Sequence, residues 1–169
     1  RKIGKYADYE RFGIDMVKEI RRRVGDNYPI MYRIDLSLML NETYKDKMDE
    51  VPSLKKFRNG RTVADTLRYM KNLVEAGVDM IQVAQANHTG NMADTIPPMG
   101  TQVDNWTLPI ATKVKEVVSV PVATVGRVLT VANGEEILAN GQADIIAYGR
   151  SLLCDADIAL KVEKDEPIR

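Results

Sequence analysis

Two glycine–arginine pairs follow apolar stretches in the second half of the chain. "PVATVGRVLT" contains Gly126 and Arg127, and "ADIIAYGRSLLCD" contains Gly149 and Arg150. A glycine lets the backbone approach a ligand closely, and an arginine presents a planar fork of donors that matches phosphate. A helix that opens just after such a turn also favours an anion. Together the pairs predict a phosphate site, although the glycines could instead serve tight turns while the arginines reach solvent.

Arg33 stands in "IMYRID", near the end of another apolar stretch. A cation buried in such a strand needs a partner. One interpretation is a structural ion pair with Asp35 or Asp79. The other is an arginine that faces an electron-rich cofactor ring.

His88, the only histidine, lies in the polar stretch "AQANHTGNMADTIPPMG" directly after a predicted strand. An imidazole there could donate a proton near neutral pH, although it could equally be a loop histidine without a chemical role. Cys154 is the only cysteine, so no internal disulfide or cysteine metal cluster fits within the chain. We predict no metal site, and we expect Cys154, after the apolar "SLL", to be buried rather than reactive.

The composition narrows the class of protein. The 169 residues are 44% hydrophobic, enough for one domain or part of a larger one. A formal net charge of zero gives no sign of a nucleic-acid or anionic-membrane partner. No stretch approaches the about 18 apolar residues of a membrane span, and none resembles a signal peptide. A cytoplasmic protein is the default expectation.

Helical and extended patterns alternate along the chain. The predicted strands are nearly continuous apolar runs, typical of parallel strands covered on both sides. They span 29–34, 79–84, 121–125 and 143–148. Helices are expected over 8–25, 62–77, 106–117, 130–141 and 155–164, with Thr62, Asp65 and Thr130 as capping residues. Phe12, Met16, Ile20 and Val24 fall four apart and predict the buried face of the first helix.

Four such units could form a small doubly wound α/β sheet or half of an eight-fold barrel. No G-x-G-x-x-G follows the first strand, which disfavours a dinucleotide-binding Rossmann domain. Gly-Arg pairs just past the last two strands favour the barrel, where the final loops commonly hold phosphate. A sugar-phosphate isomerase or aldolase barrel is a further possibility, for which Asp35 is the one obvious catalytic candidate.

Several stretches together resemble the old yellow enzyme family of NADH:flavin oxidoreductases. They are "RFGIDMVKEIRRRVGDNYPIMYRID", "GRTVADTLRYMKNLVEAGVDMIQVAQ", "PVATVGRV" and "EEILANGQADIIAYGRSLLCDADIALK". The likeness is greatest to the branch with 2,4-dienoyl-CoA reductase, 2-enoate reductase and the bile-acid enoate oxidoreductases. It implies that residues 1–169 are part of an FMN-binding (β/α)8 TIM barrel, its C-terminal half with strands five to eight.

The resemblance also implies roles for individual residues. Arg33 matches the strand-five arginine beside the flavin ring, where its charge would favour reduced flavin. Gly126 and Arg127 match one phosphate loop, and Gly149 and Arg150 match the next. His88 resembles the strand-six histidine that assists substrate protonation. The implied reaction uses NAD(P)H to reduce FMN and then an activated C=C bond, as in an enoyl-CoA or enone.

Two features depart from the family pattern. Residues 36–61 are longer and more polar than expected. Strands one to four, and the iron–sulfur motif and second nucleotide-binding domain typical of this branch, have no counterpart in the chain, so a 4Fe–4S cluster and FAD are expected only in a longer parent protein. We therefore expect a fragment that is inactive alone, at most binds phosphate, and self-associates through open sheet edges.

Overall fold

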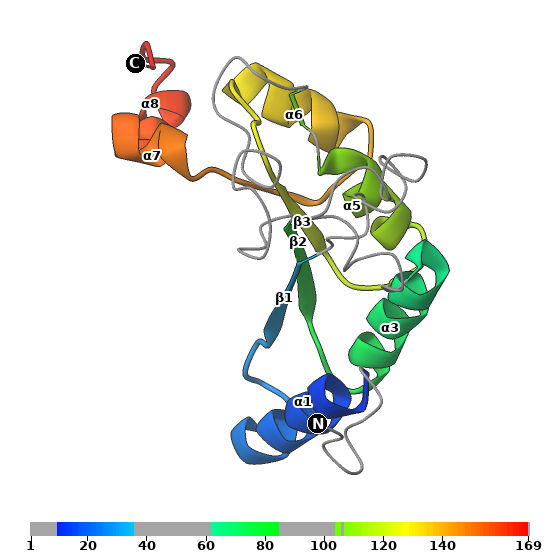
Figure 1. Ribbon diagram of the computed structural model, residues 1–169. Helices are drawn as coiled ribbons and strands as arrows, with labels where there is room; N and C mark the ends of the chain where they lie inside the picture. Colours follow the sequence, from blue (N-terminus) through cyan, green and yellow to red (C-terminus); the bar gives the residue numbers. More distant parts are fainter. Residues whose placement is uncertain (1–9, 36–61, 85–103, 106, 169) are drawn as a thin grey trace, which may run out of the picture.

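A parallel sheet with helices packed on it forms the centre of the molecule (Figure 1). The computed structural model describes residues 10–35, 62–84, 104–105 and 107–168. The strands are β1 (Met31–Asp35), β2 (Met80–Ala84), β3 (Val122–Val125) and β4 (Ile145–Ala147). All neighbouring pairs are parallel, and their order in the sheet, β1-β2-β3-β4, is their order in the chain. The expected α/β class is therefore confirmed, and each strand begins and ends within two residues of its predicted bounds.

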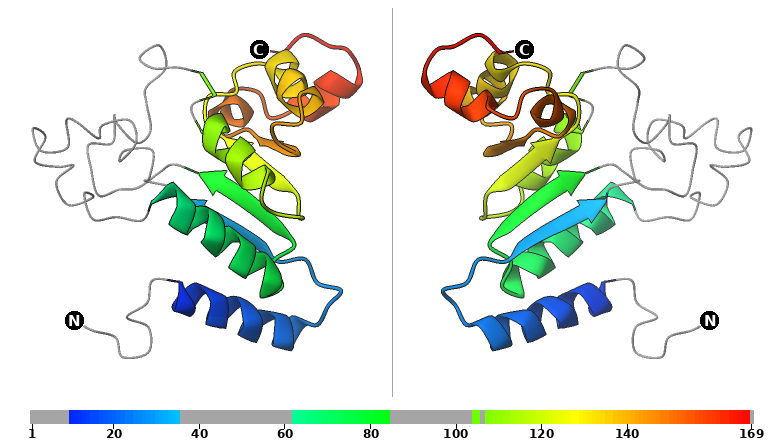
Figure 2. Two further views of the ribbon diagram at one scale, coloured as in Figure 1. Left: turned by 90° about the vertical axis from the view of Figure 1, so that its right-hand side faces the viewer. Right: turned by 90° about the vertical axis from the view of Figure 1, so that its left-hand side faces the viewer.

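Helices precede, connect and follow the strands. They are α1 (Arg11–Val24), α3 (Val63–Glu75), α5 (Leu108–Lys115), α6 (Val131–Ala139), α7 (Arg150–Cys154) and α8 (Ile158–Glu163). Figure 2 shows α3 and α5 on one face of the sheet. The main core lies between these helices and the strands, and its fully buried members include Met70, Leu73, Ile81, Ile110 and Val122. In the described part of the chain, no helix covers the opposite face of β1 to β3.

Helix ends follow the predicted capping residues. The Thr62 side chain accepts a hydrogen bond from the backbone N–H of Asp65 at 3.1 Å, and the Asp65 carboxylate accepts one from the backbone N–H of Thr62 at 3.2 Å. This reciprocal pair is a capping box at the start of α3. Thr130 caps α6 through the N–H of Asn133, so both caps are confirmed.

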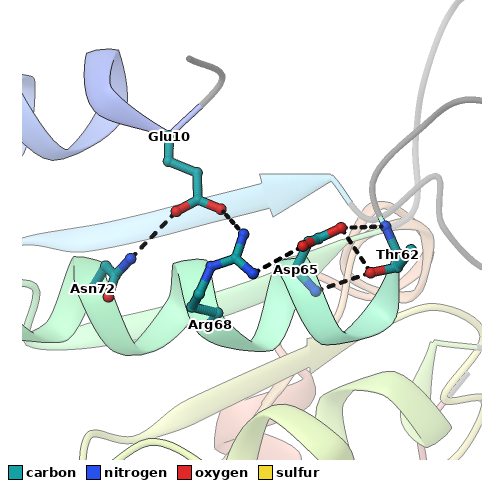
Figure 3. A network of polar contacts seen from close by, with 5 residues as sticks. All are labelled: Glu10, Thr62, Asp65, Arg68 and Asn72. Carbon is teal, nitrogen blue, oxygen red and sulfur yellow. Dashed lines mark hydrogen bonds and ion pairs between the residues drawn. The ribbon is translucent and has the colours of Figure 1, made fainter.

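A polar network ties the start of α1 to α3 (Figure 3). The Glu10 carboxylate accepts from Arg68 at 2.9 Å and from Asn72 at 3.3 Å. Arg68 also pairs with Asp65 at 2.9 Å, which continues the network into the capping box. The N-terminus of α1 is therefore held by side chains of α3, one of which, Arg68, also contacts the capping box.

The buried face of α1 differs from the prediction. The expected core residues are the exposed ones: Phe12 (56%), Met16 (46%), Ile20 (39%) and Val24 (40%). The inward face instead carries Gly13, Val17 and Arg21. A Cβ on Gly13 would lie 1.8 Å from the hydroxyl of Tyr69, so only glycine allows α1 to approach α3 this closely. Close approach at Gly13, together with the hydrogen bonds of Arg21, turns the apolar stripe outward.

The C-terminal region contains two short helices rather than the single helix expected over 155–164. Asp155 adopts an extended conformation between α7 and α8. Its buried carboxylate accepts hydrogen bonds from the N–H of Asp157 at 3.3 Å and from Lys161 at 2.6 Å. Cys154, expected to be buried, is a free and exposed thiol because this break leaves the end of α7 at the surface.

None of the helices in the described ranges has the length and apolar character that crossing a membrane requires.

Candidate functional site

The two glycine–arginine pairs lie at the carboxyl ends of two neighbouring strands. Val125 and Ala147, the last residues of β3 and β4, are register partners on neighbouring parallel strands. Gly126 and Arg127 directly follow β3, and Gly149 and Arg150 follow β4 after one further residue. Because neighbouring parallel strands have their carboxyl ends on the same side of the sheet, the two turns are neighbours there, as the sequence predicted.

The β3 turn has a backbone that requires its glycine. Gly126 has a φ of 140°, a conformation that residues with a side chain rarely adopt. Arg127 follows with a φ of 54°, in the left-handed region that is costly for a non-glycine residue. The tight-turn interpretation therefore accounts for Gly126, and the conformation of Arg127 requires support from its surroundings.

The Arg127 side chain does not extend into solvent. Only 6% of it is exposed, and it pairs with Asp104, which is 52% exposed. Nε and Nη2 of Arg127 both donate to Oδ1 of Asp104, at 3.1 Å and 2.9 Å. The plane of the guanidinium is therefore fixed by a carboxylate that lies 23 residues earlier in the chain.

The segment around Asp104 is attached to the end of β3 by further hydrogen bonds. The N–H of Asn105 donates to the carbonyl of Arg127 at 3.4 Å. The Thr107 hydroxyl donates to the carbonyl of Val125 and lies 3.1 Å from the hydroxyl of Thr124. The start of α5 and the turn after β3 thus form one hydrogen-bonded unit.

The β4 turn is more open. Gly149 has a φ of −108°, and a Cβ there would meet no atom within 4 Å. Neither packing nor a positive φ therefore requires a glycine at this position, unlike at Gly126. Arg150 is exposed and begins α7, which is only five residues long. So short a helix contributes little dipole, and the guanidinium and the open backbone remain as the donors for an anion.

Arg33 lies on the sheet face opposite the helical core. Its neighbours in sequence, Tyr32 and Ile34, pack into that core, so the alternation of a strand directs Arg33 to the other side. Its register partner is Gln82 of β2, which in turn pairs with Ala123 of β3. Arg33 is exposed in the structure, which corrects the expectation of a buried cation.

Asp79, one predicted partner for Arg33, is engaged elsewhere. Its carboxylate accepts from the backbone N–H of Ile30 at 2.7 Å and from the side chain of Arg21. These two hydrogen bonds, that of Ile30 being the stronger influence, lower the pKa of Asp79. Asp79 therefore stabilises the entry to the sheet, at the opposite end of the strands from the Gly-Arg turns.

The structure does not describe the side chains of two residues that the sequence singled out. His88 falls within 85–103, and the side chain of Asp35 is likewise not described. The structure also adds two residues to the candidate site, Gln82 and Asp104. Gln82 interrupts the apolar strand "MIQVA" as Arg33 interrupts "MYRID", a signal that the sequence does contain. Asp104 had no local signal, because its importance depends on a contact with a distant residue.

Comparison with known proteins agrees with this architecture. Residues 2–168 match the profile of the NADH:flavin oxidoreductase / NADH oxidase family. The chain belongs to this family. It is 39% identical over 163 residues to bilirubin reductase of Mediterraneibacter gnavus (strain CC55_001C), covering 96% of this chain and 23% of that protein. Cinnamate reductase of Clostridium sporogenes (strain ATCC 7955) is 30% identical over 163 residues, covering 96% of this chain and 24% of that protein.

Solved structures show the same fold at lower identity. A 2-naphthoyl-CoA reductase complex superposes with a TM-score of 0.72 at 21% identity, covering 94% of this chain and 21% of that one. Histamine dehydrogenase from Rhizobium sp. 4-9 gives 0.70 at 21% identity, covering 96% and 20%. The chain thus spans less than a quarter of the length of these structures and of the bilirubin reductase.

Proposed function

We propose that this chain forms strands five to eight of a flavin-binding (β/α)8 barrel in a larger NAD(P)H-dependent reductase. Strand order that follows the chain without reversal supports a barrel over a doubly wound sheet, in which the order reverses. The family match over residues 2–168 supports flavin and a nicotinamide donor as the cofactors. FMN is the proposed flavin, and a 4Fe–4S cluster and FAD belong to the proposed parent protein rather than to this chain.

The substrate we propose is an activated alkene, such as an enoyl-CoA or an enone. One relative is named a cinnamate reductase, and cinnamate carries a C=C bond conjugated to a carboxylate. The bound flavin would supply hydride transfer. The residues of this chain would bind and orient it, and His88 is the proposed donor of the proton to the substrate.

The adjacent Gly-Arg turns carry the proposal. They present an arginine at the end of each of two neighbouring strands, and the open backbone at Gly149 leaves room for a ligand. Two guanidinium groups match the charge and planar geometry of a phosphate. Arg33, on the sheet face opposite the helical core, would place a positive charge beside the flavin ring, three strands away from Arg150.

Flavin affinity tests the phosphate role. In the full-length protein, we expect Arg150→Ala to weaken FMN binding about tenfold and to leave riboflavin, which lacks the phosphate, unaffected. Fluorescence titration of the apoprotein measures both affinities. Arg22→Ala is the control, because Arg22 is exposed and pairs only with Glu19 on its own helix among the described contacts. An Arg150→Ala variant with undiminished preference for FMN would refute the role of Arg150 in the phosphate site.

A second candidate role, for the isolated chain, is self-association. It is favoured by the exposed apolar stripe of α1, which consists of Phe12, Met16, Ile20 and Val24. We propose that the isolated chain has no catalytic activity and self-associates through this stripe and the open edges of the sheet. Light scattering of the isolated chain tests this. A stable monomer that Ile20→Lys leaves unchanged in size would contradict it, whereas a dimer or larger species that Ile20→Lys dissociates would support it.

A further inference from the structure

We infer that Asp104 is a positioning residue that holds the Arg127 guanidinium in place for the phosphate group. This inference rests on the proposed flavin-binding function and extends it to a residue on a different βα unit. The observation behind it is the pair of hydrogen bonds from Nε and Nη2 of Arg127 to the same oxygen of Asp104, at 3.1 Å and 2.9 Å.

The pair fixes a side chain that is otherwise highly flexible. An arginine loses considerable rotamer entropy when it is immobilised on binding a ligand. Two hydrogen bonds on the Nε edge set the plane of the guanidinium before any ligand arrives. The Arg127 side chain is already 94% buried by its surroundings, since only 6% is exposed, so most of this ordering is complete in the folded protein.

The backbone of Arg127 is supported by the same segment but through different atoms. The N–H of Asn105 donates to the Arg127 carbonyl at 3.4 Å, and the Thr107 hydroxyl donates to the carbonyl of Val125. These contacts hold the left-handed turn at Arg127, where φ is 54°. Because they do not involve the Asp104 carboxylate, a substitution of Asp104 removes the side-chain support and retains the backbone support.

Charge alone predicts the opposite effect of such a substitution. A carboxylate beside an anion site repels phosphate, so its removal would tighten FMN binding if repulsion dominated. The Asp104 side chain is 52% exposed, and water screens its charge strongly. The loss of an ordered arginine is the larger effect, worth about tenfold in affinity for one immobilised side chain.

The test measures FMN and riboflavin dissociation constants for the full-length apoprotein. We expect Asp104→Ala to weaken FMN binding about tenfold without changing riboflavin binding, and to have no further effect in an Arg127→Ala background. The FMN affinity of Asp104→Asn, which retains one acceptor oxygen, should lie between those of the wild-type protein and Asp104→Ala. Asp104→Asn replaces the alanine variant in this test if the alanine variant does not fold. Asp26→Ala, an exposed carboxylate in the turn between α1 and β1, is the control for net charge.

The outcomes separate this inference from the function on which it rests. Tighter FMN binding in Asp104→Ala, or an equal loss for FMN and riboflavin, overturns the positioning role while the phosphate site stands. If Arg127→Ala and Arg150→Ala both leave the preference for FMN unchanged, the phosphate site itself is refuted, and the role of Asp104 with it.

Discussion

Arg21 donates two hydrogen bonds to the carbonyl oxygen of Gly77, which lies 56 residues later in the chain. The donors are Nε at 3.2 Å and Nη2 at 2.7 Å. Nη1 of the same guanidinium donates to the carbonyls of Gly25 at 2.8 Å and Tyr28 at 2.7 Å. One side chain therefore joins the end of α1, the turn into β1 and the turn into β2.

Arg21→Met is expected to destabilise the fold by about 2–3 kcal/mol, because several carbonyls lose a charged donor at once. Urea unfolding followed by circular dichroism measures the difference in the free energy of unfolding. Arg22→Met is the matched control on the next position of the helix. Arg22 interacts with the exposed Glu19, so its loss should cost less than about 1 kcal/mol. Equal effects of the two variants would contradict the bridging role of Arg21.

Gly13→Ala is expected to destabilise the packing of α1 on α3 by about 1–3 kcal/mol, as overpacking does in other cores. The added Cβ would overlap the hydroxyl of Tyr69, which itself lies 2.9 Å from the hydroxyl of Tyr32. Tyr69→Phe removes the overlapping oxygen. The double variant should therefore be less destabilised than the sum of the single variants, in thermal or urea unfolding.

Strict additivity of those two substitutions would mean that the close contact does not limit the packing. Gly13→Ala alone would then report only helix propensity, which favours alanine over glycine. A stabilised Gly13→Ala variant would accordingly show that α1 does not approach α3 as closely as in the structure.

The orientation of α1 shows where sequence patterns are informative and where they are not. Caps such as Thr62 depend on residues three positions apart, and the strands depend on short apolar runs, so both could be predicted locally. The spacing of apolar residues in α1 predicts a single helix face, but the prediction that this face is buried is wrong. The actual inward face follows from Gly13 meeting Tyr69 and from Arg21 meeting Gly77, contacts that span more than 50 residues.

The candidate site likewise contains features that could be predicted from the sequence and features that could not. The two Gly-Arg turns could be predicted because each directly follows a predicted strand, and parallel pairing then makes them neighbours. The pairing of Arg127 with Asp104 could not, because the contact depends on how α5 packs against β3. Gln82 is intermediate, since a polar residue within an apolar strand is visible in the sequence, but its register with Arg33 comes from the sheet.

Asp144 is expected to make stability depend on acidic pH. Its hydrogen bond from Lys115, followed by that from the backbone N–H of Val122, lowers the pKa of its carboxyl below the ordinary value of 3.8. A carboxyl with a depressed pKa in the folded state stabilises the protein above the unfolded pKa. That contribution is lost as the pH falls below about 4 and through the folded-state pKa.

Asp144→Asn should therefore reduce the difference in unfolding free energy between pH 7 and pH 3, measured by urea denaturation at both values. Asp26→Asn is the control, because Asp26 is an exposed carboxyl at a turn. If Asp144→Asn shifted stability equally at both pH values, the ion pair with Lys115 would not be the source of the pH dependence.

Arg33→Met separates the two halves of the proposed flavin site. Arg33 lies on β1 and the Gly149–Arg150 turn follows β4, at opposite edges of the sheet. In the proposed site, the positive charge of Arg33 would favour the reduced flavin, whereas the Gly-Arg turns would bind the phosphate. In the full-length protein we expect Arg33→Met to slow flavin reduction by NAD(P)H at least tenfold, measured by stopped-flow absorbance, with an unchanged preference for FMN over riboflavin.

Arg33→Lys supplies the matched comparison, because it retains the charge on the sheet face opposite the helical core but lacks the planar fork. Its reduction rate should lie between those of the wild-type protein and Arg33→Met. Arg150→Ala should show the converse pattern, with lost preference for FMN and, at saturating flavin, a nearly normal rate of reduction. If instead both arginines changed both quantities together, they would act on one part of the cofactor, and the placement of the flavin across the sheet from β1 to β4 would be wrong.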